Sequence, residues 1–116
     1  MVETIKFSDW QKLDIRAAKI LKAEDIEGAD KLYRLSIDLG KEIGKRTIVA
    51  GLKQHYKAEE LKGKSCVIFT NLEPRKLKGI ESQGMLLAAV SEDKNGKETV
   101  KLLQPESSIE LGSKVR

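Results

Sequence analysis

Few residues in this sequence combine the types and spacing that enzymes use for catalysis. His55 is the only histidine and Cys66 the only cysteine, so the chain cannot assemble a zinc site from such residues. A pairing of His55 with Cys66 or Ser82 stays open, although a lone histidine on a short helix is more often a surface or packing residue. The segment 80–84 carries Ile where the nucleophile elbow of a serine hydrolase requires Gly. We therefore expect no enzymatic activity, no metal site and no cofactor.

The segment 71–85 indicates a different chemistry, the binding of phosphate groups. Arg75, Lys76 and Lys78 place three positive charges within four positions, with a proline before them and a glycine after them. Such a loop presents cations and backbone amides to phosphates. Three further polar side chains of this segment are expected to donate hydrogen bonds to sugars or base edges: Asn71, Ser82 and Gln83.

The positive charge is concentrated in the middle third of the chain. The sequence has 22 Lys and Arg against 18 Asp and Glu, a formal net charge of +4. Residues 41–81 contain ten basic and five acidic residues, so the remainder of the chain is close to neutral. A local basic field attracts polyanions and releases their counterions on contact. An ordinary lysine-rich surface would have the same composition, so charge alone does not decide the function.

The remaining composition bounds the class of protein. A chain of 116 residues can bury enough apolar surface to fold alone, and we expect residues 1–116 to form a single domain. One cysteine allows no intrachain disulfide, which fits a reducing compartment and favours the cytoplasm. No apolar run approaches the roughly 18 residues of a membrane span, so no membrane association is expected.

Alternation of apolar and polar residues predicts a mainly β structure. Ser8 has the pattern of a capping box, which predicts a short N-terminal helix that ends before Asp14. A second short helix is expected at 52–61, and a hairpin connection at 40–44. The expected strands are 14–24, 32–39, 46–50, 66–70, 85–90 and 99–103. Alternation is broken in the first strand, which suggests a bulge or a strong coil. This order predicts an all-β, five-stranded Greek-key barrel of the OB type, with a helix between strands 3 and 4.

Aromatic residues make up only 4% of the sequence. Tyr33 and Phe69 are in phase with core positions, so few rings remain for the surface. Stacking of successive bases needs several exposed rings, which argues against a platform for single strands. We expect instead the recognition of a folded RNA through its shape and backbone.

Six segments are distinctive in combination: 13–16 (LDIR), 29–33 (ADKLY), 46–52 (RTIVAGL), 56–61 (YKAEEL), 71–79 (NLEPRKLKG) and 81–89 (ESQGMLLAA). Together they resemble the tRNA-binding domain that is appended to the C-terminus of many methionyl-tRNA synthetases or made separately as their β subunit. Stand-alone structure-specific tRNA-binding proteins and the endothelial-monocyte-activating polypeptide domain are related to it. The similarity extends from about Phe7 to Arg116.

The resemblance implies an OB fold, a homodimer and binding of tRNA through its overall shape. It also implies a non-catalytic role, in cis or as a subunit, beside the catalytic part of an aminoacyl-tRNA synthetase, with methionyl favoured. In the family, the Arg-Lys loop and the following Ser-Gln-Gly-Met are associated with tRNA contact. That association transfers here to Arg75, Lys76, Lys78, Ser82 and Met85. Three more candidates follow from charge and proximity to the motifs: Asn71, Lys31 and Lys53.

One alternative belongs to a different functional class. A secretion-chaperone-like member of the same superfamily would be a dimer that binds unfolded peptides. The basic loop suits nucleic acid better, because exposed apolar residues would serve peptides. In either case, Phe7, Trp10 and the C-terminal strands are the expected dimer interface.

Overall fold

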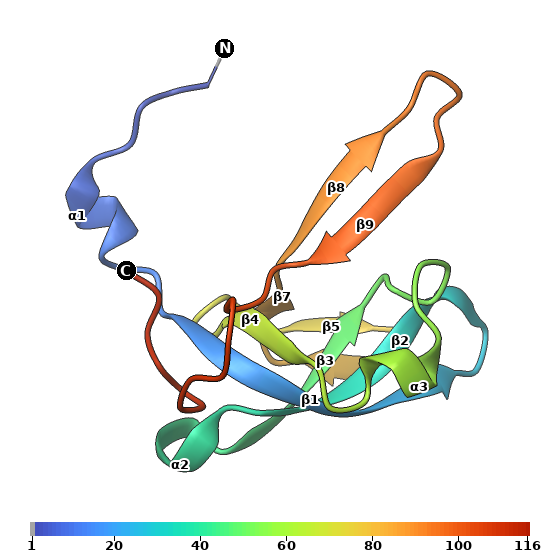
Figure 1. The fold of residues 1–116 in the computed structure, drawn as a ribbon, viewed down its shortest axis with the longest axis horizontal. Helices are drawn as coiled ribbons and strands as arrows, with labels where there is room; N and C mark the ends of the chain where they lie inside the picture. The colour runs from blue at the N-terminus through green and yellow to red at the C-terminus, as the bar shows by residue number, and fades with distance from the viewer. Residues whose placement is uncertain (1) are drawn as a thin grey trace.

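The computed structural model describes residues 2–116, which form mainly antiparallel β-strands (Figure 1). The strands are β1 (Ile15–Ile26), β2 (Ala29–Asp38), β3 (Lys45–Ala50), β4 (Ser65–Phe69), β5 (Arg75–Leu77), β6 (Ile80–Ser82), β7 (Met85–Leu86), β8 (Ala88–Glu92) and β9 (Glu98–Leu102). Three single-turn helices accompany them: α1 (Phe7–Trp10), α2 (Gly40–Ile43) and α3 (Ala58–Leu61). Within residues 2–116, no helix is long and apolar enough to cross a membrane.

Five strands form one sheet in the order β3-β2-β1-β4-β7, and each neighbouring pair is antiparallel. The long strand β1 serves two neighbours, because Ile15 to Lys19 pair with β4 and Lys19 to Ile26 pair with β2. Its register against β2 shifts between Ile20 and Lys22, which confirms the expected bulge. A bulge bends the strand and increases its twist, so β1 can curve the sheet into a barrel.

The barrel closes between β3 and the residues around the end of β6. Gln83 donates its backbone N–H to the carbonyl of Thr47 at 2.9 Å, and the Gln83 side-chain oxygen accepts the N–H of Thr47, also at 2.9 Å. The interior is filled by fully buried side chains that include Ile20, Leu35, Ile37, Leu39, Ile48, Leu61 and Ile68. The helix α3 lies between β3 and β4 in the chain, and the expected five-stranded OB barrel is confirmed.

The predicted helix over 52–61 is wrong in its first half, since only α3 is helical. The hydroxyl of Tyr33 donates a 2.8 Å hydrogen bond to the carbonyl of Tyr56. In a continuous helix, that carbonyl would accept the N–H of residue 60. The chain therefore turns at Tyr56 and starts a new helix, in which the carboxylate of Glu60 accepts the N–H of Lys57 at 2.8 Å.

The short N-terminal helix and the hairpin connection at 40–44 are both present, but each differs from its prediction in one detail. The helix α1 is present, and the N–H groups of Asp9 and Trp10 in its first turn donate to the carbonyl of Lys6. Among the described residues, no side chain caps the helix, so the capping box expected at Ser8 is absent. The connection 40–44 contains α2, a single helical turn that is closed by a 2.7 Å hydrogen bond from Gly44 to Gly40. Both turns are too short to produce a helical pattern of apolar residues in the sequence.

The strand predicted at 85–90 is divided at Leu87. The N–H of Leu87 donates to the carbonyl of Val67 in the barrel at 3.0 Å. Beyond this point the chain leaves the barrel, and β8 pairs with β9 instead. The two strands form a hairpin that projects from the barrel (Figure 1). The sequence pattern continues through Leu87 because residues on both sides of the division are in strands.

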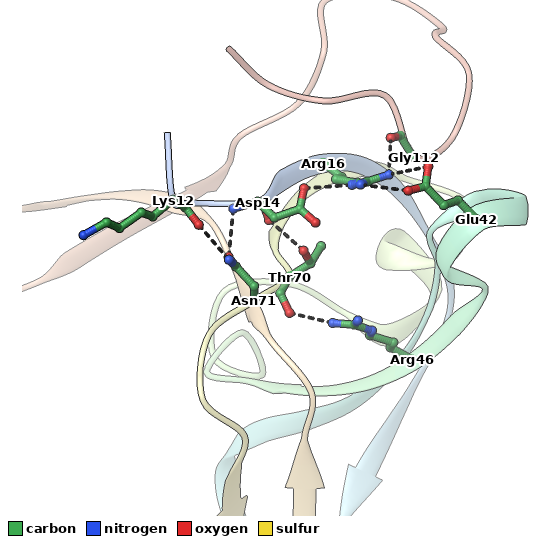
Figure 2. Close-up of polar contacts among 8 residues, drawn as sticks. All are labelled: Lys12, Asp14, Arg16, Glu42, Arg46, Thr70, Asn71 and Gly112. Atoms are coloured by element: carbon green, nitrogen blue, oxygen red, sulfur yellow. Dashed lines mark hydrogen bonds and ion pairs between the residues drawn. The ribbon is translucent and has the colours of Figure 1, made fainter. Parts of the chain in front are cut away.

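Arg16 is the only buried charged residue among residues 2–116, and it joins three segments (Figure 2). Its guanidinium donates to Asp14 at 2.9 Å, to both carboxylate oxygens of Glu42 at 3.1 and 3.2 Å, and to the carbonyl of Gly112 at 3.3 Å. These hydrogen bonds lower the pKa of the Asp14 and Glu42 carboxyls below their ordinary values. The C-terminal segment is thereby held against the start of β1, where Val115 also bonds to Ile15 at 2.8 Å.

Candidate nucleic-acid interface

The basic segment expected as a loop contains a small β-hairpin, made of β5 and β6. Its cross-strand pairs are Arg75 with Ser82, Lys76 with Glu81, and Leu77 with Ile80. Lys78 and Gly79 form the turn and have positive φ values of 52° and 81°. Two central residues in this conformation are typical of a tight type I′ hairpin turn. The expectation of an irregular loop was wrong because three-residue strands are too short to show alternation.

The hairpin packs one face on the barrel and exposes the charged pair Lys76 and Glu81 on the other. Leu77 and Ile80 pack against a small buried cluster made of Ile26, Ala29 and Val49. Successive residues of a strand point to opposite faces, so Lys76 and Glu81 lie on the outer face. Lys76 is exposed, and Arg75 is exposed at the end of β5. The charge of Lys76 is partly offset by Glu81, its cross-strand neighbour.

The tip of the hairpin lies beside the turn between β1 and β2. Lys78 and Lys31 are both exposed and line one surface hollow, with Asp30 as its acidic residue. Lys78 also lines a neighbouring hollow together with Arg34. The sequence reasoning missed Arg34, although its outward position in the alternating strand 32–39 was a usable signal. Three cations from two separate segments, β2 and the basic hairpin, therefore converge at this end of the barrel.

Acidic residues limit how far this basic surface extends. The hollow that contains Arg34 and Lys78 is also lined by Glu24, Asp25 and Glu27. Lys53 forms a 3.1 Å ion pair with Asp25, and its backbone N–H donates to the carbonyl of Lys31 at 3.2 Å. Lys53 is thus adjacent to Lys31, but the carboxylate of Asp25 neutralises its positive charge. Solvent screens this ion pair because the Asp25 side chain is 73% exposed, so the pair is weak and a phosphate could replace Asp25 as the partner of Lys53.

Ser82 is placed to close the barrel rather than to face solvent. Only 5% of it is exposed, and its hydroxyl accepts the N–H of Val49 at 3.0 Å and donates to the carbonyl of Gly84 at 3.2 Å. The following glycine is required, because a Cβ at Gly84 would lie 2.8 Å from the carbonyl oxygen of Phe69. The run Ser-Gln-Gly therefore supplies side-chain acceptors to the edge of β3, and the hydroxyl of Ser82 has no free access to a ligand.

Asn71 is likewise engaged with the backbone (Figure 2). Its amide nitrogen donates to the carbonyl of Lys12 at 2.7 Å, and its amide oxygen accepts the N–H of Asp14 at 2.8 Å. Thr70 adds a 2.7 Å hydrogen bond from its hydroxyl to the Asp14 carbonyl. Asn71 thus fixes the start of the basic segment to the chain that precedes β1.

Met85 lies apart from the hollow that Lys31 and Lys78 share. It is 44% exposed and lines a groove between the end of β3 and the projecting β8–β9 hairpin. Val90 and Val100 of the hairpin form the far wall of this groove. The expected site is therefore divided into a cationic part at the hairpin and an apolar part at Met85.

The residues considered for catalysis do not form a reactive group. Cys66 is fully buried, and the burial raises the pKa of its thiol to about 12, so the thiolate is not available near neutral pH. The ring of His55 faces Glu98, with the nearest atoms 4.0 Å apart. Within residues 2–116, no group of three or more His, Cys, Asp or Glu is placed to hold a metal ion.

The family described as "putative tRNA binding domain" matches residues 15–114, from the first residue of β1 to the C-terminal segment. The chain belongs to this family. Among its relatives, the methionine–tRNA ligase of Pyrococcus horikoshii is 53% identical over 115 residues. These residues cover 99% of the chain but only 15% of that ligase.

Two solved structures are similar to this tRNA-binding domain over nearly their whole lengths. A MetRS-related protein from Pyrococcus horikoshii has a TM-score of 0.84 and 34% identity, and the match covers 99% of this chain and 100% of the other. The chaperone CsaA of Bacillus anthracis has a TM-score of 0.86 and 31% identity, with 98% and 100% covered.

The cations of this tRNA-binding domain lie where OB folds commonly bind oligonucleotides. In such barrels the loop between strands 1 and 2 and the loop between strands 4 and 5 flank the binding face. Here Lys31 follows the β1–β2 turn, and the basic hairpin lies in the connection from β4 to β7. Arg34, farther along β2, shares the second hollow with Lys78. The topology thus brings together basic residues that are up to about 50 positions apart in the sequence.

Proposed function

We propose that the chain is a non-catalytic module that binds tRNA by its shape and retains it for an aminoacyl-tRNA synthetase, of the methionyl kind. The observation that carries this proposal is the convergence of Lys31 and Lys78 at the end of an OB barrel, next to Arg75 and Lys76 on the same hairpin. Such a module acts in the cytoplasm, in cis or as a subunit. It raises the effective concentration of tRNA near the catalytic part of the enzyme.

The proposed contacts differ among the candidate residues. Arg75, Lys76, Lys78 and Lys31 bind phosphates, because their side chains are exposed. Lys53 joins them when a phosphate replaces Asp25, and Met85 supplies an apolar contact from the groove. Two candidates act indirectly, since their polar atoms are bonded to the backbone: Ser82 and Asn71.

The affinity for tRNA is expected to fall steeply with salt. Each phosphate contact releases about one counterion, so four or five contacts predict a log-log slope of several units. The measurement is a fluorescence anisotropy titration of labelled bulk tRNA at several salt concentrations between about 50 and about 200 mM, a range over which phosphate contacts lower the affinity strongly.

A flat salt response would refute phosphate binding as the main source of affinity. The similarity to the chaperone CsaA supports the alternative, in which the protein binds unfolded peptides. This alternative predicts different results in two measurements. In that case the purified protein would carry no nucleic acid, judged by its absorbance at 260 nm, and would suppress the aggregation of a denatured client protein.

We further propose that the domain forms a homodimer through its terminal segments. Phe7 is 71% exposed and Ile5 is 64% exposed, and Phe7 and Trp10 line a hollow with Val115 from the opposite end of the chain. Exposed apolar groups of this kind favour association, since burying each contributes about 1.5–3 kcal/mol. Light scattering is expected to give the mass of a dimer, and Phe7→Ser is expected to shift the mass toward a monomer. A monomeric parent chain would refute the proposal.

A further inference from the structure

Arg46 is one of the ten cations of the basic middle segment, but its side chain is directed into the protein. It is half-buried, and its Nη1 donates to the carbonyl of Thr70 at 2.6 Å and to the carbonyl of Gln83 at 3.1 Å. Figure 2 shows the guanidinium reaching the Thr70 carbonyl. Within residues 2–116, Arg46 forms no ion pair with a carboxylate. Its charge is therefore directed at two backbone dipoles.

These two carbonyls mark the two ends of the segment that carries the basic hairpin. Thr70 follows directly after β4, where the chain leaves the barrel, and Gln83 follows directly after β6, where the chain returns. One nitrogen atom of Arg46 thus ties both ends of the segment 70–83 to β3. Hydrogen bonds from a cation are about twice as strong as those between neutral groups. We call Arg46 with its two carbonyl partners the neck of the hairpin.

Neutral hydrogen bonds support the neck on both sides. Thr70 bonds to Asp14 through its hydroxyl, and Gln83 bonds to Thr47 through its backbone and its side chain. The apolar pair Leu77 and Ile80 packs farther along the hairpin. Loss of the Arg46 contacts would leave the hairpin attached but less ordered, with two carbonyls deprived of their donor.

We propose that Arg46 is a positioning residue for tRNA binding, which holds the basic hairpin in place without contacting phosphate itself. The inference rests on the proposed function, because it assumes that the hairpin grips tRNA. A hairpin fixed at both ends presents its cations already ordered, so less conformational entropy is lost on binding. The positive charge of Arg46 thus strengthens hydrogen bonds within the protein, whereas the charge of Lys76 is exposed and available to phosphate.

The test compares Arg46→Met with Lys76→Met, two variants that each remove one positive charge. Both are expected to weaken tRNA binding, Arg46→Met by about tenfold through disorder of the hairpin. The salt dependence separates them. Lys76→Met should lower the log-log slope by about one unit, as the loss of one phosphate contact does, while Arg46→Met should keep the slope of the parent.

A second variant and a second readout guard against a simple failure to fold. Gln83→Met removes the side-chain hydrogen bond from Thr47 that supports the neck, keeps the backbone bond and changes no charge. It is expected to weaken binding with an unchanged slope. In both neck variants, heteronuclear NOE values at Lys78 and Gly79 should fall, while those in β1 and β2 stay at parent values.

Three results would overturn the inference. These are a slope lowered by one unit in Arg46→Met, an unchanged affinity in the folded neck variants, or an unchanged NOE at the hairpin tip. A parent chain that does not bind tRNA would instead overturn the proposed function, so the two failures are distinguishable.

Discussion

Replacing Arg75, Lys76 and Lys78 together by Gln is expected to weaken tRNA binding by about a hundredfold or more at physiological salt. The three side chains are exposed on one hairpin, so each can reach a separate phosphate. The log-log slope against salt should fall by up to about three units, because up to three counterions are no longer released. Anisotropy titrations of labelled tRNA at several salt concentrations measure both quantities. The barrel should remain folded, since none of these side chains is buried.

A matched control removes three positive charges near the end of β2, which is the end of the strand far from Lys31 and the basic hairpin. Lys19 and Lys45 both pair in register with Asp38, the last residue of β2, and Lys41 is in α2 next to it. Asp38 lies about 20 Å from Lys31 along the strand, given the rise per residue of a β-strand. The triple replacement of Lys19, Lys41 and Lys45 by Gln changes the net charge equally. If this control lost as much affinity as the hairpin variant, general electrostatic attraction would explain binding and the proposed site would be wrong.

The barrel was predictable from the sequence because its long strands alternate over several residues. In β2, the buried residues Tyr33, Leu35 and Ile37 recur at every second position. The broken alternation in β1 indicated its bulge in the same way. The strand β5 and the helix α2 were not predictable, because three residues or a single turn are too few for a period to be recognised.

The sequence predicted where the charged residues of the site lie in the chain, but not which polar side chains face solvent. The density of basic residues located Arg75, Lys76 and Lys78, and the structure exposes all three. Whether a polar side chain faces solvent or the backbone depends on contacts between distant segments. Ser82 bonds to Val49 and Arg46 to Gln83, each more than 30 positions away. No local sequence pattern encodes such partners, so the sequence reasoning could not assign these residues to closure of the barrel.

A large loss of stability is expected for Arg16→Met, which should reduce the free energy of unfolding by about 2–4 kcal/mol. The variant leaves the carboxylate of Asp14 and the carbonyl of Gly112 without their donor, and it removes the side chain that links Glu42 of α2 to the C-terminal segment. The estimate is below that for a fully buried ion pair, because the side chain of Glu42 is 74% exposed. Urea denaturation followed by far-UV circular dichroism measures the change. Glu42→Gln is the control, and its effect should be clearly smaller.

Acid should reduce the difference between the parent and Arg16→Met. The pKa of Asp14 is lowered in the folded state, mainly by its hydrogen bond from Arg16. A lowered pKa means that the carboxylate stabilises the fold above its ordinary value of 3.8, and that this stability is lost as the pH falls further through the folded value. The difference should therefore be constant between pH 7 and about pH 5 and shrink below about pH 4. A difference that stayed constant at low pH would show that Arg16 stabilises the protein through packing and the Gly112 carbonyl, and not through its carboxylate partners.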